Sequence, residues 1–195
     1  ASSVVRGVDR ALVVVDLPFG SYQGNPKEAL NSSIRIMKES GGHAVKLEGG
    51  IEVASTVARI VQSGIPVMGH LGLTPQSIYQ FGTYAVRAKE NSEASKLLED
   101  ALALQEDGCL ALVLEKIPAA LAANVTASLR IPTIGIGAGG VVDGKVLVQD
   151  NMRGMKTEFN PRFLRGYAPL AELIPEAIRQ SVGGVRAQKF PHDTE

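Results

Sequence analysis

The chain has 195 residues, and its 20 lysines and arginines balance its 20 aspartates and glutamates. This length is enough for one domain with a large core. The balanced charge excludes a generally cationic protein that binds nucleic acid through its overall charge, and basic and aromatic residues do not alternate as they do in single-strand binders. Cys109 is the only cysteine, so an intrachain disulfide is excluded, and its apolar surroundings predict a buried thiol that is not a nucleophile.

The sequence contains no apolar run long enough to cross a bilayer, and it does not open with a signal peptide. We therefore expect a protein without a membrane partner, located in the cytoplasm, or in the mitochondrial matrix if the source is eukaryotic. The chain begins with Ala1 and lacks an initiator methionine, so we expect that it is not the whole gene product.

Short apolar segments alternate with helical segments along the chain. Six segments rich in Val, Ile, Leu and Ala predict strands that are buried on both faces, as strands of a parallel sheet are. They are Ala11–Val15, His43–Leu47, Ile65–Gly69, Cys109–Leu114, Thr133–Ile136 and Lys145–Val148.

Helices are predicted after most of these strands. Asn25 and Pro26 cap and begin the first helix, which stops near Gly41 and Gly42. The alternation shows no linker, so we predict one domain over residues 1–195. The later helices are predicted at about Ile51–Ser63, from Ser92 to near Gly108, from Pro118 to Arg130, and from about Asn160, the last broken or kinked by Pro169 and Pro175.

Four of the predicted strands run directly into an ionisable residue, namely Asp16, Glu48, His70 and Glu115. In a (β/α)₈ barrel the carboxyl ends of the strands form a ring around the active site. An open sheet would spread the same residues along a line. We therefore predict an α/β fold of the TIM (β/α)₈ barrel type, although only six of its βα units can be identified in this sequence.

Asp16 and Glu48 lie at the ends of neighbouring predicted strands. Two converging carboxylates suit Mg²⁺, which keeps several waters and takes one or two protein carboxylates. We predict a magnesium site at these two residues; the alternative is a pair of solvated charges at the rim. No set of histidines and cysteines has the spacing of a zinc site.

Lys46 and His70 are candidates for contacts with a substrate. Lys46 lies two residues before Glu48, so both side chains point to the same side of the strand. A lysine there needs an anionic partner, which is either a substrate carboxylate or one of Glu48 and Glu115. His70 could donate to a substrate oxygen or move a proton; the alternative is a structural histidine bonded to a backbone carbonyl.

Glu115 is the best candidate for a general base. It ends a very apolar strand, where desolvation raises the proton affinity of a carboxylate toward the range that a base near neutral pH needs. The alternative is an ion pair with Lys116 or Lys46.

Several segments together resemble the ketopantoate hydroxymethyltransferase family. They occur in the order and spacing of that family and cover most of the chain. They are DLPFGSY at 16–22, AVKLEGG at 44–50, GIPVMGHLGLTPQS at 64–77, LEKIP at 114–118, IPTIGIGAG at 131–139 and DGKVLV at 143–148.

This resemblance implies a decameric barrel related to phosphoenolpyruvate mutase and isocitrate lyase. It implies Mg²⁺-dependent transfer of a hydroxymethyl group from methylene-tetrahydrofolate to α-ketoisovalerate, which gives ketopantoate for pantothenate and coenzyme A synthesis. Carried over residue by residue, it implies that Asp16 and Glu48 are metal ligands, that Lys46, His70 and Asp16 contact the substrate, and that Glu115 is the base.

The sequence departs from this family at its start. In the family two βα units precede the DLPFG strand, and they carry a further metal-ligand aspartate and a serine that touches the substrate. Neither motif is present, so we expect an N-terminally incomplete barrel whose sheet does not close. The alternatives are a catalytically inactive truncated relative that acts as a structural subunit, and another Mg²⁺-dependent lyase that acts on an α-keto acid.

Overall fold

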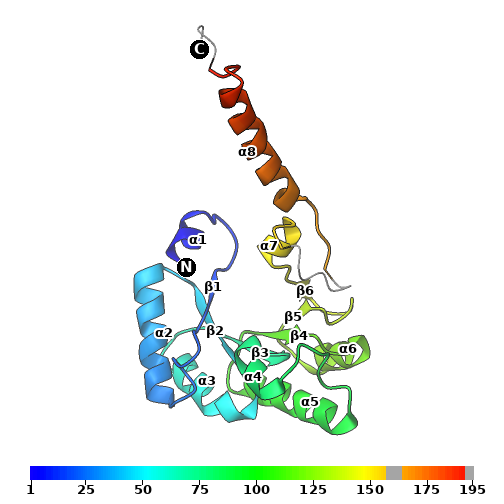
Figure 1. Ribbon diagram of the computed structural model, residues 1–195. Helices are drawn as coiled ribbons and strands as arrows, with labels where there is room; N and C mark the ends of the chain where they lie inside the picture. Colours follow the sequence, from blue (N-terminus) through cyan, green and yellow to red (C-terminus); the bar gives the residue numbers. More distant parts are fainter. Residues whose placement is uncertain (157–163, 192–195) are drawn as a thin grey trace. The chain divides into compact units, whose positions relative to one another are not determined.

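A computed structural model describes residues 1–156 and 164–191 of the chain (Figure 1). The chain divides into two compact units, residues 1–146 and 147–195. The single barrel domain expected over residues 1–195 stays a prediction.

The first unit is built on a parallel sheet whose six strands lie in sequence order (Figure 1). Each strand pairs with its chain neighbours, so β1 and β6 are the two edges of the sheet within the described residues. The result is a curled half-barrel with alternating helices, which confirms the six βα units of a barrel and the expectation that the sheet does not close. The strands are β1 (Val14–Asp16), β2 (Ala44–Glu48), β3 (Val67–Gly72), β4 (Ala111–Glu115), β5 (Thr133–Ile136) and β6 (Gly144–Lys145).

The helices of this unit follow the predicted ones closely. The side chain of Asn25 accepts the N–H of Glu28 at 3.0 Å, and Gly41 ends the same helix with a left-handed φ of 70°, as its sequence indicates. The short α1 and α4 are helices that sequence reasoning did not predict. The helices are α1 (Ser2–Arg6), α2 (Pro26–Ser40), α3 (Ala54–Val61) after the 3₁₀ turn η1 (Ile51–Val53), α4 (Ile78–Phe81) after η2 (Pro75–Ser77), α5 (Asn91–Glu106) and α6 (Ala119–Ser128).

Strand β3 lies further along the chain than predicted. Pairing with β2 begins at Val67, after Pro66, which has no N–H to give to the ladder. Pairing with β4 continues to Gly72, which lies opposite Glu115. His70 is therefore not a residue that follows the strand, as the sequence predicted, but lies inside it, two residues before its end.

The core lies between one face of the sheet and the helices. Residues of β2 alternate in their burial. Val45 and Leu47 are fully buried, whereas Lys46 and Glu48 are only partly buried. This alternation sends the apolar side chains toward the helices and the ionisable ones to the opposite face of the sheet. The largest fully buried side chains of the core include Leu17, Ile60, Leu104, Leu112 and Leu114.

Cys109 belongs to this core and is 3% exposed. Burial raises the pKa of its thiol to about 12, so the thiolate does not form near neutral pH. The prediction of a buried, unreactive thiol is confirmed.

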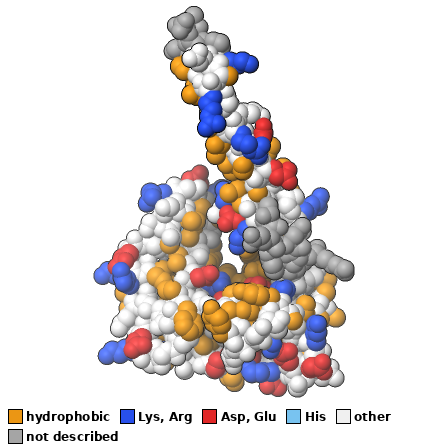
Figure 2. Space-filling view, viewed as in Figure 1, with side chains coloured by type: hydrophobic (Ala, Val, Ile, Leu, Met, Phe, Trp, Pro, Cys, Tyr) orange, Lys and Arg blue, Asp and Glu red, His pale blue; other side chains and the backbone are white. Residues whose placement is uncertain are grey.

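The second unit contains α7 (Gln149–Met152) and α8 (Leu170–Arg186). The predicted start of its last helix, near Asn160, lies outside the described residues. Residues 164–169 are not helical, and helix α8 begins directly after Pro169, so no helix crosses that proline, whereas α8 continues through Pro175. No described helix combines the length and the hydropathy that a membrane crossing needs. Helix α8 buries none of its side chains and exposes Leu173, Ile174, Ile178, Val182 and Val185 (Figure 2).

Candidate active site

The five ionisable residues singled out by the sequence lie on the same face of the sheet. Asp16 lies opposite Lys46 in the register of β1 with β2, and Glu48 lies opposite His70 in the register of β2 with β3. Glu115 lies opposite Gly72, two residues beyond His70 and therefore on the same side. Since neighbours in register point the same way, the sheet gathers these side chains at the carboxyl ends of four strands.

These side chains form one connected polar cluster. Lys46 Nζ lies 3.0 Å from Asp16 Oδ1 and 3.3 Å from His70 Nδ1. His70 Nδ1 is also 3.7 Å from Glu48 Oε1, and His70 Nε2 is 3.3 Å from Glu115 Oε2. His70 is therefore the centre of the cluster and contacts three of its other members.

His70 is almost completely buried, with 3% of its side chain exposed. Lys46 can only donate, so Nδ1 accepts its hydrogen bond and the hydrogen of the imidazole ring lies on Nε2. That Nε2 atom has no hydrogen-bond partner, because it is close to Glu115 but not aligned with it. A buried donor without a partner is costly, and a substrate oxygen placed there would satisfy it.

Glu48 is the most unfavourably placed carboxylate of the cluster. Burial raises its pKa above the ordinary value of 4.5, and the negative charge of Asp16 adds to this. The N–H of Gln76, which donates to Glu48 Oε2 at 2.9 Å, and the charges of His70 and Lys46 only partly oppose the effect. A cation bound at this end of the sheet would stabilise the Glu48 carboxylate.

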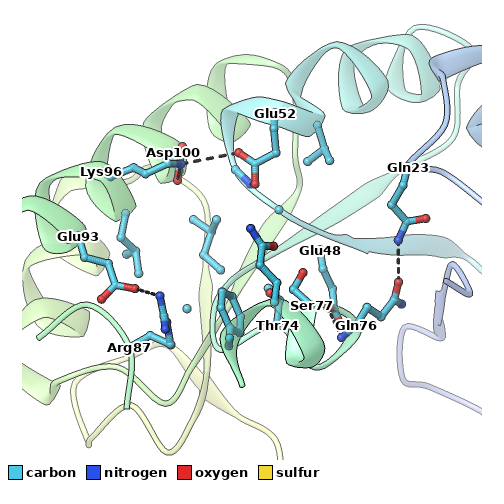
Figure 3. Close-up of a pocket in the computed structure, with 18 of the residues that line it drawn as sticks. Gln23, Glu48, Glu52, Thr74, Gln76, Ser77, Arg87, Glu93, Lys96 and Asp100 are labelled. Atoms are coloured by element: carbon cyan, nitrogen blue, oxygen red, sulfur yellow. Dashed lines mark hydrogen bonds and ion pairs between the residues drawn. The ribbon is translucent and has the colours of Figure 1, made fainter. Parts of the chain in front are cut away.

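Two neutral residues, Tyr22 and Gln76, hold Glu48 in place, and sequence reasoning missed both. The Tyr22 hydroxyl accepts the N–H of Glu48 at 3.2 Å and donates to Gln76 Oε1 at 3.0 Å. Gln76 Nε2 donates to the carbonyl of Leu17 at 2.9 Å, and Gln76 lies beside Glu48 (Figure 3). Burial raises the pKa of Tyr22 to about 12, so it stays a donor. The only signal was their position in loops that follow β1 and β3.

Gly72 lets β3 and β4 approach each other next to Glu115. Its φ is +92°, and a Cβ at this position would lie 2.3 Å from the carbonyl oxygen of Glu115. That carbonyl accepts the N–H of Leu73 at 2.8 Å. A larger residue would force the strands apart, so this glycine keeps Glu115 within reach of His70.

The structure brings all five predicted residues together but gives two of them other partners than expected. Asp16, and not Glu48 or Glu115, is the carboxylate closest to Lys46, because the two are direct neighbours in the register of β1 and β2. His70 contacts charged side chains, and the alternative of a bond to a backbone carbonyl is not what the structure shows.

Comparison with known proteins gives a consistent result. The family described as "Ketopantoate hydroxymethyltransferase" matches residues 1–193. Proteins named 3-methyl-2-oxobutanoate hydroxymethyltransferase from Flavobacterium johnsoniae and Christiangramia forsetii are each 64% identical over the whole chain, which spans 72% of their length. The protein of that name from Salinibacter ruber is 63% identical, with 74% of its length covered.

The chain belongs to the ketopantoate hydroxymethyltransferase family. The family resemblance seen in the sequence is therefore confirmed, and the share of the relatives' length that is covered agrees with two βα units that this chain does not contain. A solved isomerase from Streptomyces coelicolor A3(2) matches 66% of this chain and 34% of its own at 17% identity, with a TM-score of 0.45.

The oxygen donors of this family member fit a hard divalent cation, although no group of three metal-ligand side chains exists among the described residues. Asp16 keeps 63% of its side chain exposed, so it has an oxygen free to bind an ion. The side chain of Glu48 is only 8% exposed, and its raised pKa would be lowered by a cation. Mg²⁺ needs few protein carboxylates when a chelating substrate and water supply the rest.

The raised pKa of Glu48 predicts a pH-dependent stability. Because the folded state binds this proton more tightly than the unfolded chain, the free energy of unfolding should fall as pH rises from about 4.5 through the folded-state pKa. In Glu48→Gln this fall should be smaller, and at neutral pH the variant should be more stable than the parent protein. Urea denaturation across this pH range, with a chelator present, measures the effect.

The matched control is Glu99→Gln, which changes an exposed glutamate of α5. It should keep the pH dependence of the parent protein. An unchanged pH dependence in Glu48→Gln would contradict the assignment.

Proposed function

We propose that this protein transfers a hydroxymethyl group from methylene-tetrahydrofolate to α-ketoisovalerate and so forms ketopantoate. The single observation that carries the proposal is the cluster in which buried His70 joins Lys46, Glu48 and Glu115 at the ends of neighbouring strands, in a chain of this family. The relatives' names support the same keto acid, 3-methyl-2-oxobutanoate, and the same transferred group.

In this proposal Lys46 and His70 bind the keto acid. Lys46 has 16% of its side chain exposed, so its charge is largely desolvated and attracts a carboxylate more strongly than a surface lysine would. The unpartnered Nε2–H of His70 donates to a substrate oxygen. Asp16 lies against Lys46 and limits how far its ammonium group can turn.

Glu115 is the proposed base. Its side chain is 15% exposed, and its Oε2 lies 3.3 Å from His70 Nε2. The close approach of β3 and β4 at Gly72 maintains this short distance. A keto acid that is bound to His70 would therefore place the carbon next to its ketone close to the Glu115 carboxylate. Glu115 takes the proton from that carbon, and the electron pair of the broken C–H bond forms the new C–C bond to the one-carbon unit. The two C–N bonds between this unit and the folate break, their electron pairs stay on the nitrogens, which take up protons, and water supplies the hydroxyl oxygen, so tetrahydrofolate is released.

Asp16 and Glu48 would hold Mg²⁺ in this site. When bound, the ion supplies a Lewis acid that makes the proton next to the ketone more acidic. The partial exposure of Asp16 and the buried, destabilised carboxylate of Glu48 support this placement. The homo-oligomeric assembly, the decamer in particular, and the cytoplasmic location stay predictions.

The direct test supplies Mg²⁺, α-ketoisovalerate and methylene-tetrahydrofolate and measures ketopantoate by mass spectrometry. We expect ketopantoate to form, and to disappear when either organic substrate is left out. A protein that binds the keto acid but forms no ketopantoate would indicate an inactive structural subunit. A protein that cleaves the keto acid without the donor would indicate a lyase.

Glu115→Gln should abolish exchange of deuterium from D₂O into α-ketoisovalerate, with a loss of at least about 100-fold, because the amide cannot accept the proton. NMR of the keto acid measures this step without the one-carbon donor. Mg²⁺ binding should remain close to that of the parent protein. Retained exchange would mean that another group is the base.

Asp16→Ala should weaken Mg²⁺ binding by about tenfold or more, because it removes one of two protein oxygens from the ion. Isothermal titration calorimetry with MgCl₂ and α-ketoisovalerate measures the affinity. The matched control is Asp9→Ala, which removes an exposed aspartate before β1. Equal affinities for the two variants would remove Asp16 from the metal site.

A further inference from the structure

A cavity of about 600 Å³ lies next to the candidate active site, within residues 1–146 (Figure 3). It is lined by the loop after β1, by the end of β2 with the turn that follows, by the end of β3 through α4, and by Arg87 with the first turns of α5. Strands β2 and β3, which supply part of this lining, are each paired on both sides. Its volume is typical of small-molecule sites.

The charged side chains on the α5 side of this cavity are paired with one another. Arg87 forms an ion pair with Glu93, and Lys96 Nζ lies 2.5 Å from Asp100 Oδ2 and 3.7 Å from Glu52 Oε2 (Figure 3). Because these charges are largely neutralised, this wall does not favour a phosphate or another small, strongly charged ligand.

Apart from Glu48, the rest of the lining is apolar, aromatic or neutral and polar. Leu71 and Leu97 are buried, whereas the rings of Phe19 and Tyr79 are 75% and 98% exposed. Exposed rings at a cavity gain stabilisation when a flat ring packs against them. The neutral hydrogen-bonding groups of the lining are Gln23, Thr74, Gln76, Ser77 and Gln80.

Glu48 belongs both to this cavity and to the charged cluster. Its Oε1 lies on the side of His70, and its Oε2 accepts the N–H of Gln76, which lines the cavity. Tyr22, which bonds both Glu48 and Gln76, lines the cavity as well. A molecule in the cavity would therefore lie next to a keto acid held by His70, with Glu48 between them.

We propose that this cavity binds the one-carbon donor, with the flat pterin ring of methylene-tetrahydrofolate against Phe19 and Tyr79. The inference rests on the proposed function, which needs a second substrate beside the keto acid. A pterin has two apolar faces and an edge of amide-like donors and acceptors. The exposed rings match its faces, and the side chains of Thr74, Ser77 and Gln80, which line the cavity, match its edge.

The test measures the binding of tetrahydrofolate, the donor without its one-carbon unit, by isothermal titration calorimetry. The parent protein should bind it, and Phe19→Ala and Tyr79→Ala should each weaken binding by about three- to tenfold because each loses a ring contact. Both side chains are exposed, so neither change removes a core contact. The matched control is Tyr84→Ala, an exposed tyrosine of the segment after α4 that does not line the cavity, and it should bind as the parent does.

No binding to the parent protein, or equal binding by the parent, Phe19→Ala and Tyr79→Ala, would overturn the inference. Failure of the proposed function is seen separately, in the deuterium exchange of α-ketoisovalerate, which needs no donor. Tetrahydrofolate binding without exchange would keep the cavity assignment and reject the reaction. Deuterium exchange without tetrahydrofolate binding would reject the cavity assignment and keep the proposed proton abstraction from the keto acid.

Discussion

The register of four parallel strands is the constraint on which the site depends. Because neighbours in register point to the same face, the pairing of Asp16 with Lys46 and of Glu48 with His70 brings together charges that are far apart in the sequence. A shift of one residue in β2 would send Lys46 and Glu48 into the apolar core and bring Val45 and Leu47 to the site. The burial of those two residues against the helices therefore determines where the charges lie.

Burying this many ionisable groups has an electrostatic cost, and the cluster offsets it unevenly. Lys46 has Asp16 and His70 as partners, whereas Glu48 keeps a raised pKa and His70 Nε2 keeps no hydrogen-bond partner. A carboxylate that would gain from a cation and a donor that would gain from an acceptor are the features of a site prepared for a ligand. A chelated keto acid would supply both the acceptor and part of the ion's coordination.

Glu48 also connects the cluster to the neighbouring cavity. Tyr22 and Gln76, which line the cavity, bind the backbone N–H and Oε2 of Glu48, and His70 lies beside its Oε1, so Glu48 borders both the cavity and the charged cluster. The cluster is charged, whereas the cavity is lined by aromatic and neutral side chains and, on its α5 side, by charges that are paired with one another. Two substrates of different chemistry, a small keto acid and a flat heterocycle, would each find a matching surface within reach of the other.

The sequence by itself determined the βα alternation, the six strands, the family and the five ionisable residues, because apolar runs and the residues that end them are local patterns. It misplaced β3 and did not identify Tyr22 or Gln76, because strand ends and neutral hydrogen bonds are decided by a partner strand and by distant loops. Only the tertiary structure decided that Asp16 lies against Lys46, that Glu115 lies against His70, and that Glu48 borders a cavity. These are contacts between residues far apart in the chain, and the physical reason is that strand register and the close approach at Gly72 exist only once the sheet has formed.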